Sequence, residues 1–304
     1  MIFRCKKYPL LPVLALAFCP VALLAGEKLD PTSHAARVTH AMQLFQQGKY
    51  HEAEDEFRTL LDEDEKKQGL DHTDTLQVRK NLAIVFGVDG KFLEAETVLR
   101  DGIDLESGVL GPENKDVLEF RELLATTIAR EGRITEAVRD FRELLAIRER
   151  TCQPGDVAIA RARNNLGNVL FDQKKYAEAA ELLRAAQPGL EKGLAATDST
   201  ILLNHMNLAK CLRGLGRFEE AEKEQRVIIK SLQQFFAGDP EVDLAKLNLA
   251  ETLLTERKFA EALEVARNAE SHLTEMLGAD SLKAREAHQV VRKIANAQSE
   301  PAVK

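Results

Sequence analysis

Residues 207–222 read NLAKCLRGLGRFEEAE, and parts of this stretch return along the chain at a nearly constant interval. The tripeptide Gly-Arg-Phe at 216–218 has five counterparts: Gly-Lys-Tyr at 48–50, Gly-Lys-Phe at 90–92, Gly-Arg-Ile at 132–134, Lys-Lys-Tyr at 174–176 and Arg-Lys-Phe at 257–259. The step between neighbours is 42 residues four times and 41 residues once. Six copies in one register indicate an array of structural repeats.

Two further features recur with each tripeptide. A small residue lies seven positions before it: Ala41, Ala83, Ala125, Gly167, Ala209 and Ala250. A Glu-Ala pair follows it: 52–53, 94–95, 136–137, 178–179, 220–221 and 261–262. We interpret each unit as two antiparallel helices, because the Glu suits the positive end of a second helix and the small residues suit close helix crossings.

The turn between the two helices is predicted from the unit around Gly90. Apolar residues before it fall near three- and four-residue spacing, as in one face of a helix: Leu76, Leu82, Val85 and Phe86. Gly90 ends that helix, because glycine accepts the left-handed conformation without steric cost. Lys174 and Arg257 stand at this position in two units, and each costs about 1 kcal/mol if it keeps the same conformation. Connections between units, at 111–114, 197–199 and 238–240, combine turn formers with candidate helix caps.

The Leu82-Ala83, Gly90-Lys91-Phe92 and Ala95 columns resemble the tetratricopeptide repeat. The 42-residue period, the Asn-Asn-Leu-Gly string at 164–167 and the segment 216–222 are most similar to the kinesin-light-chain variety of that family. The resemblance implies an all-α fold, a right-handed superhelical solenoid of antiparallel helix pairs. The sequence departs from the family at one position early in the first helix, where the family carries an aromatic residue. Five units have a polar or charged residue there: Arg79, Arg121, Arg163, His205 and Lys246.

The chain is therefore expected to divide into six repeats with short segments at either end. We predict a signal peptide over 1–25, a linker over 26–33, repeats over 34–283, a capping helix over 284–297 and a disordered tail over 298–304. The first segment has a basic start and an apolar run, Leu10 to Leu24, before Ala25-Gly26. An uncleaved anchor is the alternative, although the run is short for a membrane span. A lipid-attached form at Cys19 is weaker, because Phe18 precedes it where a small residue is usual.

Charge and cysteine usage narrow the class of partner. Cleavage after Ala25 would remove three basic residues, leaving 39 Lys and Arg against 49 Asp and Glu, a net charge of 39 − 49 = −10. This balance disfavours a nucleic-acid partner. Cys152 and Cys211 fall nearly two repeats apart, and helices pack roughly 8–10 Å from one another, so we expect two free thiols with Cys211 buried.

No arrangement of residues in the sequence indicates catalysis, a cofactor or a metal. None of the seven histidines forms a zinc-protease string. The recurring Glu is explained by helix electrostatics, since it occurs in every repeat and a catalytic site would occur once. The segment 87–91 lacks the glycine spacing and the hydroxyl residue of a phosphate loop. We therefore expect that the protein is not an enzyme.

Peptide binding is the stronger hypothesis. The first helices of such arrays line a concave groove, and asparagines at comparable positions in the kinesin-light-chain family hold the main chain of a bound extended peptide. By this resemblance the amide candidates are Asn81, Asn164, Asn165, Asn168, Asn207 and Asn248. Arg161, Lys210 and Arg213 would add a basic wall suited to an acidic segment. The alternative is that some of these asparagines bond neighbouring helices.

The groove is expected to centre on residues 161–251. The first and third units carry Val38-Thr39 and Glu122-Leu123 where Asn would stand, so the ladder of amides is interrupted. We predict an exported scaffold, periplasmic or secreted, that binds a protein or peptide and has no membrane span once the signal is cleaved. The alternative is a structural, self-associating component that organises an envelope complex.

Overall fold

The computed structural model describes residue 30 and residues 32–299. Within these residues the chain forms thirteen α-helices and no strand, arranged as consecutive helix pairs. The predicted all-α array of antiparallel pairs is thus confirmed. The predicted signal peptide and residues 300–304 lie outside the described residues. The chain divides into two compact units at Pro154–Gly155, which are described separately below.

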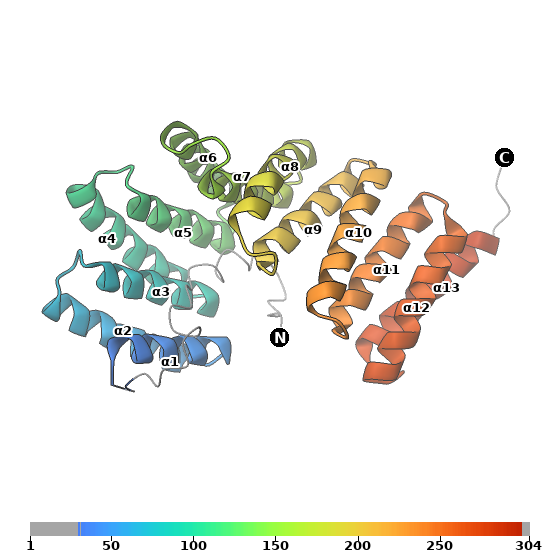
Figure 1. Cartoon of the computed structure of the whole chain (residues 1–304), viewed down its shortest axis with the longest axis horizontal. Coiled ribbons are helices and arrows are strands. Elements are labelled where there is room, and N and C mark those ends of the chain that lie inside the picture. The colour runs from blue at the N-terminus through green and yellow to red at the C-terminus, as the bar shows by residue number, and fades with distance from the viewer. Residues whose placement is uncertain (1–29, 31, 300–304) are drawn as a thin grey trace. The chain divides into compact units, whose positions relative to one another are not determined.

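The first unit holds three helix pairs, which follow one another in Figure 1. Its helices are α1 (His34–Gln46), α2 (Tyr50–Lys67), α3 (Thr73–Asp89), α4 (Phe92–Leu110), α5 (Lys115–Glu131) and α6 (Ile134–Thr151). Each helix packs on the next in the chain, and α3 also contacts α5. Phe57, Phe120 and Ile84 are among the large side chains that are fully buried in this unit.

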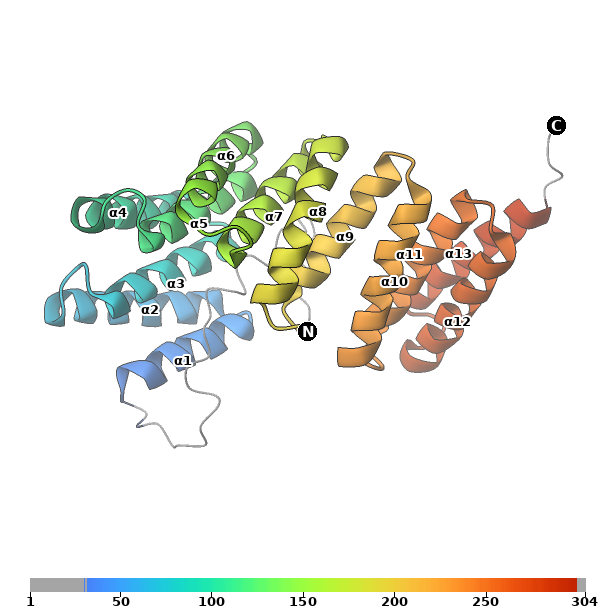
Figure 2. The same cartoon turned by 45° about the horizontal axis from the view of Figure 1, so that its top comes forward.

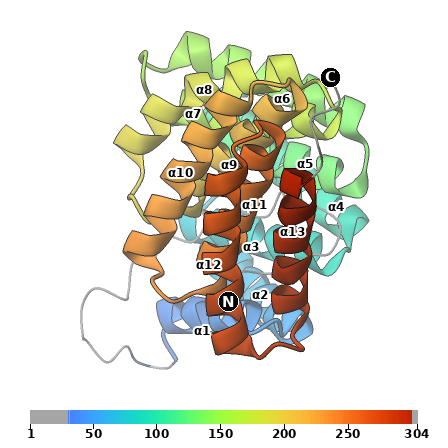
Figure 3. The same ribbon diagram turned by 90° about the vertical axis from the view of Figure 1, so that its right-hand side faces the viewer.

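The second unit holds three further pairs and a final single helix, whose alternating directions can be followed in Figure 2. The helices are α7 (Val157–Asp172), α8 (Tyr176–Gly193), α9 (Ser199–Gly214), α10 (Phe218–Phe235), α11 (Pro240–Thr255), α12 (Phe259–Leu277) and α13 (Leu282–Ser299). In Figure 3 α13 lies beside α12 at the end of the unit. Ala287 and Ile294 of α13 are fully buried in the core that α11 and α12 provide, so α13 covers the last pair.

The turns inside the pairs have the predicted left-handed residue. Gly90 ends α3 with φ of 83°. Lys174 and Arg257 keep the same conformation without being glycine, each with φ of 60°. These are the two non-glycine residues with positive φ among the described part of the chain. Two of the six turns therefore carry local backbone strain.

The connections between pairs end in helix caps, as predicted. Asn114, Asp198 and Asp239 precede α5, α9 and α11, and the side chain of each accepts a hydrogen bond from the backbone N–H two residues on. Such a bond satisfies one of the orphan donors at a helix start. The caps explain why each first helix begins where it does.

Small residues lie where helices cross. The alanines of the recurring Glu-Ala pairs have no exposed surface: Ala53, Ala95, Ala137, Ala179, Ala221 and Ala262. A Cβ added to Gly167 would lie 2.8 Å from Leu183, too close for an unshifted neighbour. The small columns read from the sequence are therefore packing positions.

The charged residues that replace the family's aromatic column make polar contacts instead. Arg79 is 6% exposed and donates to Glu65 at 2.5 Å. His205 is 7% exposed and lies 2.6 Å from Glu224. In these two repeats an ion pair or hydrogen bond between helices occupies the place of a packed ring.

Both cysteines of the repeat region are free, and Cys211 is buried, as predicted. Burial raises the pKa of the Cys211 thiol to about 12. Among residues 30 and 32–299, no helix combines the length and the apolar character that a membrane span requires.

Candidate peptide-binding face

Most of the candidate groove residues come together on α7, α9 and α11 of the second unit. Arg161, Asn164, Asn165 and Asn168 lie on α7, Asn207, Lys210 and Arg213 on α9, and Asn248 on α11. Asn81 lies on α3 of the first unit, where it is buried and accepts a hydrogen bond from Gln77 at 3.0 Å. The candidates thus form one cluster on the second unit and a separate residue on the first.

Amide side chains connect α7 to α9 at two levels. The Nδ2 of Asn207 donates to the Oδ1 of Asn168 at 2.9 Å. The Nδ2 of Asn204 donates to the Oδ1 of Asn164 at 3.2 Å and to the carbonyl oxygen of Leu183 at 3.0 Å. Asn164, Asn168 and Asn207 therefore bond neighbouring helices, as the alternative hypothesis expected. A role in ligand binding stays a prediction for them.

These bonds leave two amide oxygens unused. The Oδ1 atoms of Asn204 and Asn207 are buried and have no hydrogen-bond partner. Asn207 is 3% exposed and its nitrogen is committed to Asn168, so its oxygen is held in one orientation. A buried acceptor without a partner is unfavourable, and a donor from a bound molecule or from water would remove that cost.

Lys210 is exposed and lies three positions after Asn207 on α9. Its Nζ is 6.0 Å from the centre of the Phe171 ring, within the range of a cation–π contact. Desolvation lowers the pKa of Lys210, and the negative charge of Asp172 opposes that shift. Desolvation also raises the pKa of Asp172, whose Oδ2 is buried and unpartnered.

Arg213 and Glu251 continue the face toward α11 and α13. Arg213 lies 3.7 Å from Glu251, and Lys293 of α13 lies 3.3 Å from the other oxygen of the same carboxylate. The basic wall read from the sequence is therefore partly balanced by Asp172 and Glu251. The face carries more cations than anions, and both signs are present.

The remaining candidates differ in accessibility. Asn165 is 4% exposed, whereas Asn248 is exposed and its backbone carbonyl accepts a hydrogen bond from Gln225 at 3.2 Å. Arg161 is half-buried, and its Nε is buried without a partner. The face therefore ranges from enclosed amides at α7 to an open amide at α11.

Three residues of this face were missed by the sequence reasoning. Asn204 lies three positions before Asn207, as Asn165 lies three before Asn168, and that spacing was a usable signal. Asp172 and Glu251 gave no such signal, because single acidic residues on a charged helix are common. Within the described residues no group of His, Cys, Asp or Glu is placed to hold a metal ion.

Comparisons with known proteins agree with this fold. Residues 32–105 and 116–192 match the family model of the tetratricopeptide repeat, so these segments are tetratricopeptide repeats. A comparison with curated proteins finds no match.

Solved structures give the same result. The chain is similar to a Podosopora anserina putative kinesin light chain with nearly identical repeats (19% identity, TM-score 0.59, 68% of this chain and 99% of that one). It is also similar to a Rap protein complexed with competence and sporulation factor (14%, 0.60, 90% and 78%). A third likeness is a signal-transduction ATPase with a tetratricopeptide-repeat sensor from Pyrococcus horikoshii (13%, 0.68, 88% and 39%). At these identities the likeness establishes the fold.

Proposed function

We propose that this tetratricopeptide-repeat protein is an exported scaffold, without catalysis of its own, that binds an extended segment of a protein or peptide. The binding surface is the face formed by Asn165, Asn168, Asn207, Lys210, Arg213 and Asn248, called the amide face below. It lies within the second unit, on the first helices of three consecutive pairs. Export rests on the basic and apolar pattern of residues 1–25, which lie outside the described structure.

The Oδ1 of Asn207 is the observation that carries this proposal. It is a buried acceptor, fixed in orientation by the bond from Asn207 to Asn168, and it has no partner. An extended peptide offers backbone N–H donors at regular intervals, and it makes such bonds whatever its side chains are. Asn248 on the next first helix is exposed and offers both a donor and an acceptor.

The charges of the amide face favour a partner with carboxylates. Lys210 and Arg213 belong to the amide face, and the neighbouring charges are the cation Lys293 and the anions Asp172 and Glu251. A carboxylate on the partner would compete with Glu251 for Arg213, whose contact with Glu251 at 3.7 Å is long for a charge-assisted hydrogen bond. A Rap protein, similar in fold, was solved together with a separate factor, which supports a binding role for such arrays.

The test uses the partner that the chain retains from its own envelope extract. That partner is purified, and its dissociation constant is measured by calorimetry against the original chain and against Asn207→Ala. We expect at least about tenfold weaker binding, because a buried acceptor that meets a donor contributes roughly 1.5 kcal/mol. Gln234→Ala, on the exposed side of α10, is the matched control and should leave binding unchanged.

Stability measurements separate binding from folding. Asn168→Ala removes the same inter-helix bond but leaves the Asn207 oxygen in place, so it should lower the melting temperature while weakening binding less than Asn207→Ala does. Equal affinity of the original chain and Asn207→Ala would exclude the amide face as the binding surface.

Self-association is the second candidate, and exposed apolar residues at the ends of two helices favour it. Phe235 and Phe236 at the end of α10 are 37% and 43% exposed, and Met276 and Leu277 at the end of α12 are 40% and 41% exposed. Exposed apolar clusters on soluble proteins often mark contacts with other proteins. Light scattering of residues 26–304 tests this function: a stable oligomer that Phe236→Ser dissociates would support it, and a monomer at all concentrations would exclude it.

A further inference from the structure

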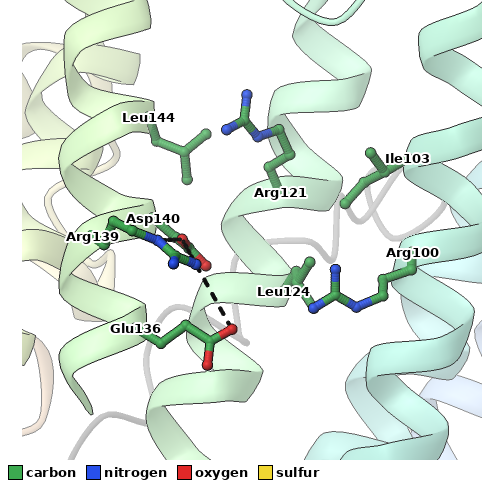
Figure 4. Close-up of a pocket in the computed structure, with 8 residues that line it drawn as sticks. All are labelled: Arg100, Ile103, Arg121, Leu124, Glu136, Arg139, Asp140 and Leu144. Atoms are coloured by element: carbon green, nitrogen blue, oxygen red, sulfur yellow. Dashed lines mark hydrogen bonds and ion pairs between the residues drawn. The ribbon is translucent and has the colours of Figure 1, made fainter. Parts of the chain in front are cut away.

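A cavity of about 230 Å³ opens between the two second helices α4 and α6 of the first unit, with α5 between them. Figure 4 shows three arginines around it, one from each helix: Arg100, Arg121 and Arg139. Ile103, Leu124 and Leu144 provide its apolar lining, and Glu136 and Asp140 lie on the α6 side. The cavity thus combines an apolar floor with a rim of three cations and two carboxylates, both of which pair with Arg139.

The second unit has a cavity at the equivalent place, between α10 and α12 with α11 between them, of about 360 Å³. The repeat register places Arg226 and Ile229 where Arg100 and Ile103 stand, and Lys246 and Leu249 where Arg121 and Leu124 stand. Four lining positions therefore recur with the same character: two cations and two aliphatic residues. A repeated arrangement of this kind is a property of the repeat.

The origin of both cavities lies in the column that departs from the family. Arg121 and Lys246 occupy the position where the family carries an aromatic residue, and a ring there would fill space between successive second helices. Arg121 instead extends to Glu143 at 2.7 Å, and Lys246 to Asp243 and Asn268, each at 2.9 Å. The flexible side chain leaves room that a ring would occupy.

The side chains of the same column are buried in two other repeats. Arg79 is buried against Glu65, and His205 is buried between Gln187 and Glu224. A polar side chain in this column is therefore not accessible in every repeat. Arg121 and Lys246, like Arg163 in the same column, remain partly exposed, and the first two line the two cavities.

Arg100 and Arg226 at the rim have about half of their side-chain surface exposed, whereas Lys246 pairs with the buried carboxylate of Asp243. Arg100 is 52% exposed and bonds Glu96 on its own helix at 2.6 Å. Arg226 is 46% exposed and bonds Glu222 and Glu261. Exposed ion pairs contribute little to stability, so a carboxylate from another molecule can share these cations at small cost.

The two cavities are called the outer cavities below. We propose that each of them binds an apolar side chain of a partner protein that has a carboxylate on the adjacent residue, such as Leu followed by Asp. The apolar side chain occupies the floor formed by Ile103 and Leu124, or by Ile229 and Leu249. The carboxylate meets the rim cations, Arg100 and Arg121 or Arg226 and Lys246. This surface is separate from the amide face and gives the scaffold a second kind of contact.

The test is a titration of the full chain, with its Ile and Leu methyl groups labelled for NMR, using the capped dipeptide acetyl-Leu-Asp-amide. The matched probe is acetyl-Leu-Asn-amide, which has the same shape without the charge. We expect the methyl signals of Ile103, Leu124, Ile229 and Leu249 to shift with the acidic probe, and to require about fivefold more of the neutral one. No shift, or equal shifts with the two probes, would overturn the proposal.

Two variants assign the effect to each cavity. Arg121→Phe should fill the first cavity and abolish the shifts of Ile103 and Leu124 while those of Ile229 and Leu249 persist. Lys246→Phe should do the reverse. Arg100→Gln keeps the space and the fold, and should remove the preference for the acidic probe at the first cavity. The proposal is wrong if each Phe variant leaves both pairs of shifts unchanged.

Discussion

The side chains of Asn168 and Asn207 are joined by a hydrogen bond of 2.9 Å that links the first helices of two successive repeats. Both residues are at least 97% buried, which makes the bond part of the packing between repeats. We expect Asn168→Ala and Asn207→Ala each to lower the free energy of unfolding by about 1–3 kcal/mol, since each leaves a buried partner unsatisfied. The double variant should cost less than the sum of the single ones. Urea unfolding of the four proteins measures this coupling, and simple additivity would contradict it.

Glu106 is a buried carboxyl group in α4 that should weaken the first unit at neutral pH. It has no exposed surface, and neither of its oxygens has a hydrogen-bond partner. The equivalent positions of the fourth, fifth and sixth repeats hold Leu190, Leu232 and Leu273. We expect Glu106→Leu to stabilise the protein by about 1–3 kcal/mol at pH 7, measured by denaturant unfolding.

The pH dependence of that gain has a definite sign. Burial, followed by the charges of Asp116 and Asp71, raises the pKa of Glu106 above its ordinary value. A carboxyl group with a raised pKa in the folded state favours folding while it is protonated, and this advantage is lost as the pH rises through the folded pKa. The gain from Glu106→Leu should therefore be larger at pH 7 than at pH 4. An equal gain at the two pH values would show that charge is not the cause.

Glu222 should make the second unit sensitive to acid. Burial opposes its ionisation, but hydrogen bonds from Lys258 and Arg226 outweigh burial and lower its pKa to about 2. The stabilisation is therefore present above the unfolded pKa, near 4.5, and is lost as the pH falls toward 2. Glu222→Gln should be less stable than the original chain at pH 7, and the difference should shrink toward pH 2. Melting temperatures across this range provide the measurement, and a constant difference would refute the assignment.

Lys174 and Arg257 have the left-handed conformation that glycine adopts without strain. Replacing either with Gly should stabilise the protein by about 0.5–1 kcal/mol, because relief of the backbone strain exceeds the entropy that glycine gains in the unfolded chain. Gly216→Lys is the matched reverse substitution at the same turn position, with φ of 73°, and should destabilise by a similar amount. Thermal melts compare the three. Destabilisation by Lys174→Gly would mean that the lysine side chain contributes more than its backbone costs.

The two free cysteines should differ in reactivity toward iodoacetamide. Cys152 is half-buried at the end of α6, whereas Cys211 is buried with its pKa raised to about 12 by desolvation. The thiolate is the reacting species, so at pH 8 Cys152 should be modified first and Cys211 only when the second unit opens. Mass spectrometry of unreduced residues 26–304, which hold Cys152 and Cys211 as their two cysteines, should give one modification over time and then two in denaturant. Rapid double modification of the folded chain would contradict the burial of Cys211.

The repeats could be located from the sequence because the same structural requirements recur in every unit. A left-handed turn, a cap and a small residue at each helix crossing recur in register, so all six copies support the same assignment of two antiparallel helices per unit. The positions of Lys174 and Arg257 followed from the register alone, although neither residue favours that conformation.

The amide face was harder to predict, because its chemistry depends on contacts between helices. The sequence identified Asn168 and Asn207 as polar residues at suitable positions, but their mutual bond depends on how closely α7 and α9 pack. Asp172 and Glu251, which offset the basic residues, are ordinary helix residues until the fold places them beside Lys210 and Arg213. The division of the chain at Pro154–Gly155 could not be predicted either, because the repeat register continues unchanged across it.

Arg121 and Lys246 line the two outer cavities from equivalent positions of their repeats. A larger side chain at either position would fill the cavity of that repeat, while the turn, cap and crossing positions stay as they are. An array built in this way can evolve new contact points one repeat at a time, because a change in one module leaves the architecture of its neighbours intact.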